Sequence, residues 1–134
     1  MKNLPLVFSA MIVGITLFQS ALVAPAINKL INAEGASVFL RYIWPKFFII
    51  IAVLSLASFV ILIINSNQNL FKYISFISFA LMFVCYLITP MINEAKDSLN
   101  DQLWSVLHAS TIVLTLITLI INILTIVYWK RVSV

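Results

Sequence analysis

Charged residues are scarce in this chain of 134 residues, and their scarcity excludes an ordinary soluble domain. Lys and Arg number 8 and Asp and Glu number 4, which makes 9% of the sequence against about 25% in soluble domains. Hydrophobic residues make up 63%, and the mean hydropathy is +1.15. The composition therefore predicts an integral membrane protein with the lipid bilayer as its main partner. The basic residues form no run of five or six, so the sequence does not indicate nucleic-acid binding.

The residues that build most catalytic and metal sites are also scarce. Cys85 is the only cysteine, which excludes an intrachain disulfide and a CxxC zinc pattern. Gly14 and Gly35 are the only glycines, so there is no glycine-rich phosphate loop. His108 is the only histidine, which excludes bis-histidine haem ligation within one chain and leaves Zn²⁺ without its usual ligand set. The sequence therefore shows no catalytic set and no assigned metal ligands, which favours a role other than enzyme.

Long apolar runs predict four membrane-spanning helices. A span takes about 20 apolar residues, so four spans with short connections use nearly the whole chain. The runs lack the alternation of barrel strands. The expected fold class is all-α, an integral membrane four-helix bundle that forms a single domain over residues 1–134. The expected helices cover about residues 4–24, 36–65, 70–89 and 103–129.

Prolines and polar residues are interpreted as the ends of these helices. Pro25 is expected to end or kink the first helix before a polar turn over residues 28–35. Pro90 is expected to end the third helix before a loop over residues 91–102 that holds three of the acidic residues. A signal peptide cleaved near Ala24-Pro25-Ala26 is the alternative for the first span, although a signal core is usually shorter, at about 7–15 residues.

A stripe of polar residues organises the C-terminal part of the chain. From Glu94 to Thr125 these residues recur at spacings of three and four, and from Leu103 onward nearly all the residues between them are apolar. Residues so spaced share one helix face, which we expect to pack against other helices while the apolar face meets lipid. The third span carries a similar seam of small and soft side chains. The stripe is Glu94, Asp97, Asp101, Trp104, His108, Thr111, Thr115, Thr118, Asn122 and Thr125, and the seam is Ser75, Ser78, Met82, Cys85 and Thr89.

A polar cleft is expected where the first and third connections lie on the same side of the membrane. Arg41 can pair there with Asp97 or Asp101, because a guanidinium engages a carboxylate through two hydrogen bonds. His108 is expected to form the floor, since ionisable groups inside membranes are costly and tend to be functional. Its alternative role is a hydrogen bond between helices near the interface. The expected cleft residues are His108, Trp104, Asp101, Asp97, Asn93, Arg41, Gln19 and Thr111.

Charge also predicts the orientation. With four spans both termini lie on one side, which carries basic residues and no acidic residue, whereas the other side carries all four acidic residues. Lys and Arg are equally numerous on the two sides, so the purely basic side is interpreted as cytoplasmic. We expect a bacterial-type inner (plasma) membrane. The basic residues on the terminal side are Lys2, Lys72, Lys130 and Arg131.

Several short motifs resemble a known membrane family. They are Phe18–Ala26 (FQSALVAPA), Gly35, Trp44–Phe48 (WPKFF), Asn93, Asp97 and Leu107–Ser110 (LHAS). The chain resembles the four-span family called domain of unknown function 4149, which is similar to eukaryotic transmembrane-protein-205-like proteins and more distantly to CopD-type copper and haem-associated bundles. The resemblance covers nearly the whole chain and implies a four-helix membrane fold without an assigned reaction. The haem-handling relatives rely on additional histidines, which this chain lacks.

Three kinds of function follow from these observations. The first is a binding or accessory membrane protein, as a homo-oligomer or a subunit of a larger complex, whose cleft around His108 holds a small ligand or a partner helix. The second is a CopD-like protein that handles haem through His108, or copper through Met82, Cys85 and His108, because Cu(I) prefers soft ligands. The third is an oligomeric small transporter or proton-path subunit that uses His108 and Asp101. The sequence assigns neither haem nor copper as a cofactor.

Overall fold

The described part of the molecule is built from four helical spans without a strand. The computed structural model describes residues 3–65 and 68–132, with side chains as far as Trp129. The first span consists of three consecutive segments, and each of the others is one helix. The elements are α1 (Leu4–Leu17), the π-helix η1 (Phe18–Val23), α2 (Ala24–Leu30), α3 (Ala33–Asn65), α4 (Asn69–Asp97) and α5 (Asp101–Val132). All four spans are long and apolar enough to cross a membrane, which confirms the predicted all-α membrane fold.

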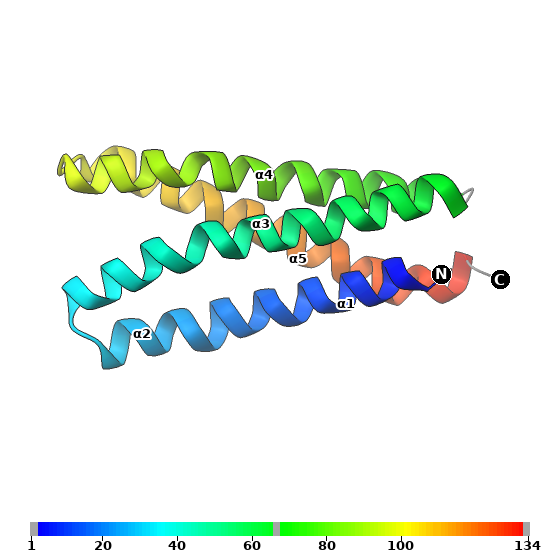
Figure 1. Ribbon diagram of the computed structural model, residues 1–134, viewed down its shortest axis with the longest axis horizontal. Helices are drawn as coiled ribbons and strands as arrows, with labels where there is room; N and C mark the ends of the chain where they lie inside the picture. Colours follow the sequence, from blue (N-terminus) through cyan, green and yellow to red (C-terminus); the bar gives the residue numbers. More distant parts are fainter. Residues whose placement is uncertain (1–2, 66–67, 133–134) are drawn as a thin grey trace.

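The spans form an elongated bundle with both termini at one end (Figure 1). α3 packs against α1 and α4, and α5 packs against α4 and α1. α5 runs obliquely behind α3, from the side of α4 near its start to the side of α1 near the termini (Figure 1). In the described part of the chain, neither η1 nor α2 packs closely against α5. The first span therefore separates from α5 beyond Leu17.

The interior carries many small hydroxyl side chains, whereas large hydrophobic side chains cover the outside. The hydroxyl of Thr115 donates to the carbonyl of Thr111 at 2.7 Å, and that of Thr118 donates to the carbonyl of Leu114 at 3.0 Å. Such bonds to the preceding turn satisfy a hydroxyl that lipid cannot hydrate, and small side chains let neighbouring helices approach closely. The predicted seam on α4 is buried as expected: Ser75, Ser78, Met82, Cys85 and Thr89.

The predicted helix ends at the two prolines are wrong. The first span continues from Pro25 to Leu30, and α4 continues from Pro90 to Asp97. A proline ring clashes with the carbonyl four residues earlier in a regular α-helix, but local π geometry can relieve this clash. Here η1 ends at Val23, two residues before Pro25, and the amide of Ala24 donates to the carbonyl of Gln19, five residues earlier. The expected turn over residues 28–35 therefore shrinks to two residues between α2 and α3.

The predicted loop over residues 91–102 is also mostly helical. Glu94 and Asp97 belong to the last turns of α4, so the stripe does not start on the helix of His108 as predicted. α4 ends in a Schellman motif, in which the amide of Asn100 donates to the carbonyl of Ala95 at 2.9 Å. This motif needs one left-handed residue, and the φ of 56° at Leu99 provides it.

From Trp104 onward the stripe on α5 faces the bundle as predicted, whereas Asp101 at the start of this helix is exposed. The side-chain oxygen of Asn100 accepts the amide of Leu103 at 3.1 Å and caps the start of this helix. Trp104 and His108 are partly exposed. The remaining members are buried: Thr111, Thr115, Thr118, Asn122 and Thr125. α5 therefore presents a partly open polar face at its start and a closed one farther along.

Candidate functional site

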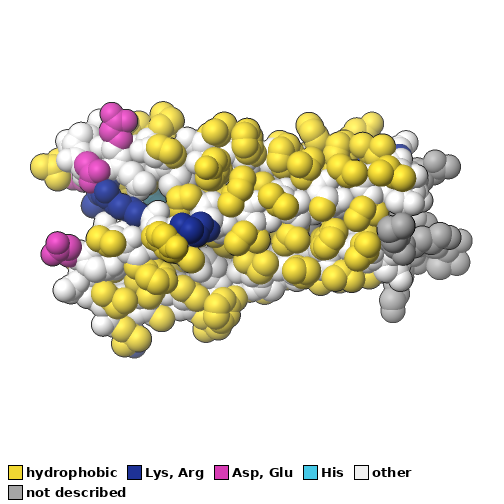
Figure 2. Space-filling view, viewed as in Figure 1, with side chains coloured by type: hydrophobic (Ala, Val, Ile, Leu, Met, Phe, Trp, Pro, Cys, Tyr) yellow, Lys and Arg dark blue, Asp and Glu magenta, His cyan; other side chains and the backbone are white. Residues whose placement is uncertain are grey.

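A cleft of about 660 Å³ lies at the acidic end of the bundle, which is the end that carries Glu34, Glu94, Asp97 and Asp101. Figure 2 shows the acidic side chains of this view gathered at one end, while hydrophobic atoms cover much of the remaining surface. All four spans contribute to the lining. It includes Thr16, Ser20, Ala24 and Asn28 of the first span, Ser37, Arg41, Trp44 and Phe48 of α3, Thr89, Asn93 and Lys96 of α4, and Trp104, His108, Thr111, Ile112, Leu116 and Leu119 of α5.

The structure brings most of the expected cleft residues together and leaves three outside the lining. Those that line the cleft are Arg41, Asn93, Trp104, His108 and Thr111. Asp97 lies at its edge through the bond to Arg41. Asp101 is exposed at the start of α5, and Gln19 is buried elsewhere in the bundle with 7% exposure.

Arg41 and Asp97 form the expected two-bond ion pair. Nη1 of Arg41 donates to Oδ2 of Asp97 at 3.0 Å, and Nη2 donates to Oδ1 at 2.6 Å. About 20 residues cross the hydrocarbon core, so Asp97, the last of the 29 residues of α4, lies outside the membrane-spanning part. Hydrogen bonding to the guanidinium holds the pKa of the Asp97 carboxyl below its ordinary value, so the pair stays charged at neutral pH. Asp101 forms no ion pair within the described residues.

Reversing the charge of Arg41 is expected to weaken the bundle moderately, and reversing Asp97 as well is expected to restore it. Arg41→Glu places two carboxylates together, so the thermal unfolding midpoint in detergent should fall by a few degrees. Adding Asp97→Arg recreates the pair with its direction exchanged. Adding Asp101→Arg instead is the matched control, because Asp101 does not contact Arg41. Equal recovery with both second substitutions would contradict the pairing.

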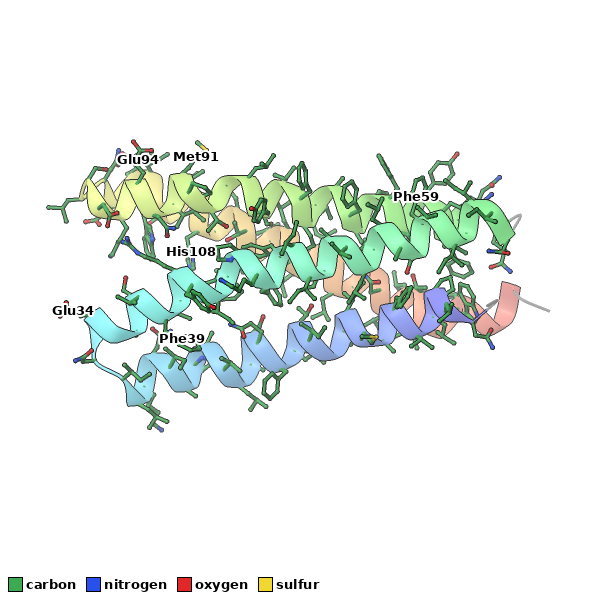
Figure 3. All side chains as sticks on the ribbon, in the orientation of Figure 1. Glu34, Phe39, Phe59, Met91, Glu94 and His108 are labelled. Atoms are coloured by element: carbon green, nitrogen blue, oxygen red, sulfur yellow. The ribbon has the colours of Figure 1, made fainter. Side chains whose placement is uncertain are left out.

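Lys96, Trp104 and His108 form a stack on one wall of the cleft. Nζ of Lys96 lies 4.7 Å from the centroid of the Trp104 ring. The rings of Trp104 and His108 are one turn apart on α5 and lie 5.0 Å apart with 8° between their planes. Figure 3 places His108 in the half of the bundle that carries Glu34 and Glu94.

The imidazole of His108 makes no hydrogen bond to the described residues. Apart from the main-chain bonds of α5, the hydrogen bond at this residue within the described chain runs from the hydroxyl of Thr111 to the main-chain carbonyl of His108, at 2.8 Å. The predicted alternative of a histidine bonded between helices is therefore not what the described residues show. His108 lines the cleft and is only partly buried, so its side chain can contact a molecule there.

Thr16 is a cleft residue that the sequence analysis missed. Its side chain is 2% exposed and lines the cleft, and its hydroxyl has no hydrogen-bond partner among the described residues. An unpaired buried hydroxyl costs about 1–3 kcal/mol, and lipid offers it no water. A polar atom of a ligand would remove this cost. Its helical spacing from Gln19 was the one signal that placed it on a buried face.

The described residues offer no compact set of metal donors. They contain no group of three or more His, Cys, Asp or Glu side chains that could hold a metal ion. Met82 and Cys85 lie in the apolar core with Ile51, and neither lines the cleft that contains His108. The haem and copper alternatives remain predictions, and the geometry of the described residues adds no support to them.

The fold and the cleft define a four-helix integral membrane protein with a partly polar cavity near one membrane surface. The family model described as a domain of unknown function (DUF4149) matches residues 7–101, and the chain belongs to this family. The matched region includes Arg41 and Lys96 and ends at the start of α5, so Trp104 and His108 lie beyond it. Searches of curated proteins and of solved structures gave no match.

Proposed function

We propose that this protein is a ligand-binding accessory protein of the membrane, and that its cleft around His108 holds one small molecule. The observation that carries the proposal is the cleft itself, which is lined by all four spans and has a volume typical of ligand pockets, about 300–1,000 Å³. Its mostly apolar walls carry a few polar groups that can orient a ligand. These include the imidazole of His108, the amide of Asn93 and the unpaired hydroxyl of Thr16.

The proposal is supported by polar groups of the lining that have no hydrogen-bond partner among the described residues. An ionisable ring inside a membrane protein is costly unless it is paired or functional. His108 has no side-chain hydrogen bond to the described residues, and Thr16 has an unpaired hydroxyl. A bound molecule with hydrogen-bonding atoms would satisfy both. The transporter alternative gains less support, because Asp101 does not line the cleft with His108.

Filling the cleft tests this function directly. The protein, purified in a mild neutral detergent, is extracted with organic solvent, and mass spectrometry measures compounds retained in proportion to protein. Leu116→Trp places a large ring in the lining and should reduce the retained ligand about tenfold, which corresponds to about 1.4 kcal/mol. His108→Phe keeps a ring beside Trp104 but removes both nitrogens, so it should also weaken retention.

Ile117→Trp is the matched control for the cleft-filling variant. Ile117 is adjacent to Leu116 and is 40% exposed, but it does not line the cleft. This variant should retain the ligand like the wild type. Equal retention by the wild type, Leu116→Trp and Ile117→Trp would contradict the proposed function.

We further propose that the protein lies in a bacterial-type inner membrane with cytoplasmic termini, as a homo-oligomer or a subunit of a larger complex. The orientation is supported by the segregation of all acidic residues to the end opposite the termini. Lys2 and the side chains of Lys130 and Arg131 lie outside the described part of the structure. Accessibility of an introduced cysteine near Lys72 to a membrane-impermeant reagent from the periplasmic side would contradict this orientation.

A further inference from the structure

The cleft has two chemically different ends. Its outer end, near the membrane surface, is lined by Lys96, Trp104 and His108. Its inner end is lined by Leu116, Leu119 and Thr115, and the hydroxyl of Thr115 already donates to the carbonyl of Thr111. The distance from Trp104 to Leu119 along α5 is about 22 Å at 1.5 Å per residue. A polar region followed by a long apolar region has the chemical pattern of a lipid with a head group and a hydrocarbon chain.

The cleft also opens sideways, between the first span and α5. Three of its lining residues are about half exposed: Leu17 at 48%, Ile112 at 49% and Leu116 at 51%. The opening follows from the path of α5, which packs against α1 but not closely against η1 or α2 within the described residues (Figure 1). Apolar surface exposed at this depth meets the hydrocarbon of the bilayer. A lipid can therefore enter this opening without leaving the membrane.

The outer end of the cleft is cationic. The charged residues of its lining are Arg41 and Lys96, and no acidic residue of the described chain joins them. The guanidinium of Arg41 is already bonded to Asp97. Lys96 lies over the ring of Trp104 and forms no ion pair within the described residues. Its ammonium group is thus the cation left for a ligand, and a charged hydrogen bond from an ammonium group to a phosphate is stronger than a neutral one.

We propose that the ligand of the cleft is an anionic phospholipid of the surrounding bilayer, with its phosphate beside Lys96 and one hydrocarbon chain along Leu116 and Leu119. This inference rests on the proposed function and specifies the class of its ligand. The ring of Trp104 lies at the interface between head and chain, where amphipathic aromatic side chains are favourable. The ring N–H of His108 can donate to a phosphate or ester oxygen of the lipid.

Native mass spectrometry in a neutral detergent tests the lipid class. The purified protein is titrated with phosphatidylglycerol, which is anionic, and separately with phosphatidylcholine of the same chains, which is zwitterionic. The wild type should bind one phosphatidylglycerol about tenfold more tightly than one phosphatidylcholine. Lys96→Gln should remove this preference, because it removes the positive charge that favours the anionic head group. It leaves the apolar part of the cleft unchanged. Lys72→Gln should keep it, because Lys72 lies at the other end of α4.

The same titration separates the failure of the lipid class from the failure of the cleft. Equal binding of the two lipids by the wild type, or an unchanged preference in Lys96→Gln, would overturn the proposal that the ligand is an anionic phospholipid. If Leu116→Trp still lowers the binding of both lipids, the cleft remains the binding site and only the class is wrong. If Leu116→Trp binds both lipids as tightly as Ile117→Trp does, the lipids bind outside the cleft and the lipid proposal fails, whereas the proposed function is still decided by the extraction assay.

Discussion

Ser78→Phe is expected to prevent the bundle from forming, so that little or no monodisperse protein is recovered in detergent. Ser78 is 0% exposed, at the contact between α4 and α5. Its hydroxyl oxygen accepts a hydrogen bond of 2.9 Å from the side-chain amide of Asn122. A phenyl ring has no space between these helices, and overpacking alone costs about 1–3 kcal/mol, occasionally more. The substitution also removes the partner of Asn122 on the other helix.

The size of this effect follows from how helices associate in lipid. Apolar side chains gain little by leaving hydrocarbon for a protein interior, so close packing and hydrogen bonds must hold the spans together. A ring at Ser78 forces α4 and α5 apart and weakens both contributions along the buried seam. The loss therefore spreads over the interface instead of staying at one residue.

Ile77→Phe is the matched control for this substitution. Ile77 precedes Ser78 on α4 and is 45% exposed, on the side that faces lipid. Size-exclusion chromatography and thermal unfolding should show this variant to be close to the wild type. A folded Ser78→Phe protein with an unchanged unfolding midpoint would contradict the packing of α4 against α5 described above.

Residue spacing predicted which faces are buried. Ser78 and Met82 on one span, and Thr118 and Asn122 on another, recur at three and four residues, and all four are nearly inaccessible in the structure. The pattern is reliable because a membrane helix places small and polar residues against other helices and large apolar residues against lipid. The two seams face each other, as the bond from Asn122 to Ser78 shows.

The helix ends could not be predicted in the same way. Pro25 and Pro90 were interpreted by the rule for soluble helices, where a proline in the interior usually ends or kinks the helix. In a membrane an open backbone is more costly, so the helix continues and adjusts its geometry locally. No pattern in the sequence predicted the π-helix η1 ahead of Pro25. The same rule, applied to Pro90, wrongly predicted that Glu94 lies in a loop, whereas the structure places it on α4.

The candidate site was predictable where it depends on charge and not where it depends on shape. Opposite charges on one side of the membrane predicted the partner of Arg41, but the choice of Asp97 over Asp101 depends on the turn between α4 and α5. In the sequence Lys96 is one of several scattered basic residues with no distinguishing pattern. Only the fold places it beside Trp104. The sideways opening depends on the path of the first span, which periodicity does not contain.

The π-helix η1 connects the path of the first span to the lining of the cleft. η1 lies where the first span stops packing against α5, and Ser20, within η1, lines the cleft. A π turn holds an extra residue, so it changes which face the following segment presents. Ala24 and Asn28 follow η1 and also line the cleft. The extra residue therefore sets which side chains of α2 line the cleft.

Insertion of one alanine after Ala21, together with Pro25→Ala, is expected to keep the bundle but reduce ligand retention at least tenfold, which is about 1.4 kcal/mol of binding energy. Because η1 already accommodates one extra residue, a further residue rotates the following residues by about 100° relative to α1, while Pro25→Ala avoids a clash with the preceding turn. Ala24 and Asn28 then leave the cleft, whereas the packing of α1 is unchanged. Ala21 is exposed, so the side chain of an alanine inserted beside it contributes little.

Pro25→Ala alone is the control for this insertion, because it keeps the number of residues and hence the side chains that face the cleft. Circular dichroism should show the same helix content in both variants, and the extraction assay should find the ligand in the control alone. Retention of the ligand by the insertion variant at the level of its control would show that the register of α2 does not shape the site. The binding groups would then be confined to α3, α4 and α5, and the role of η1 would be limited to accommodating Pro25.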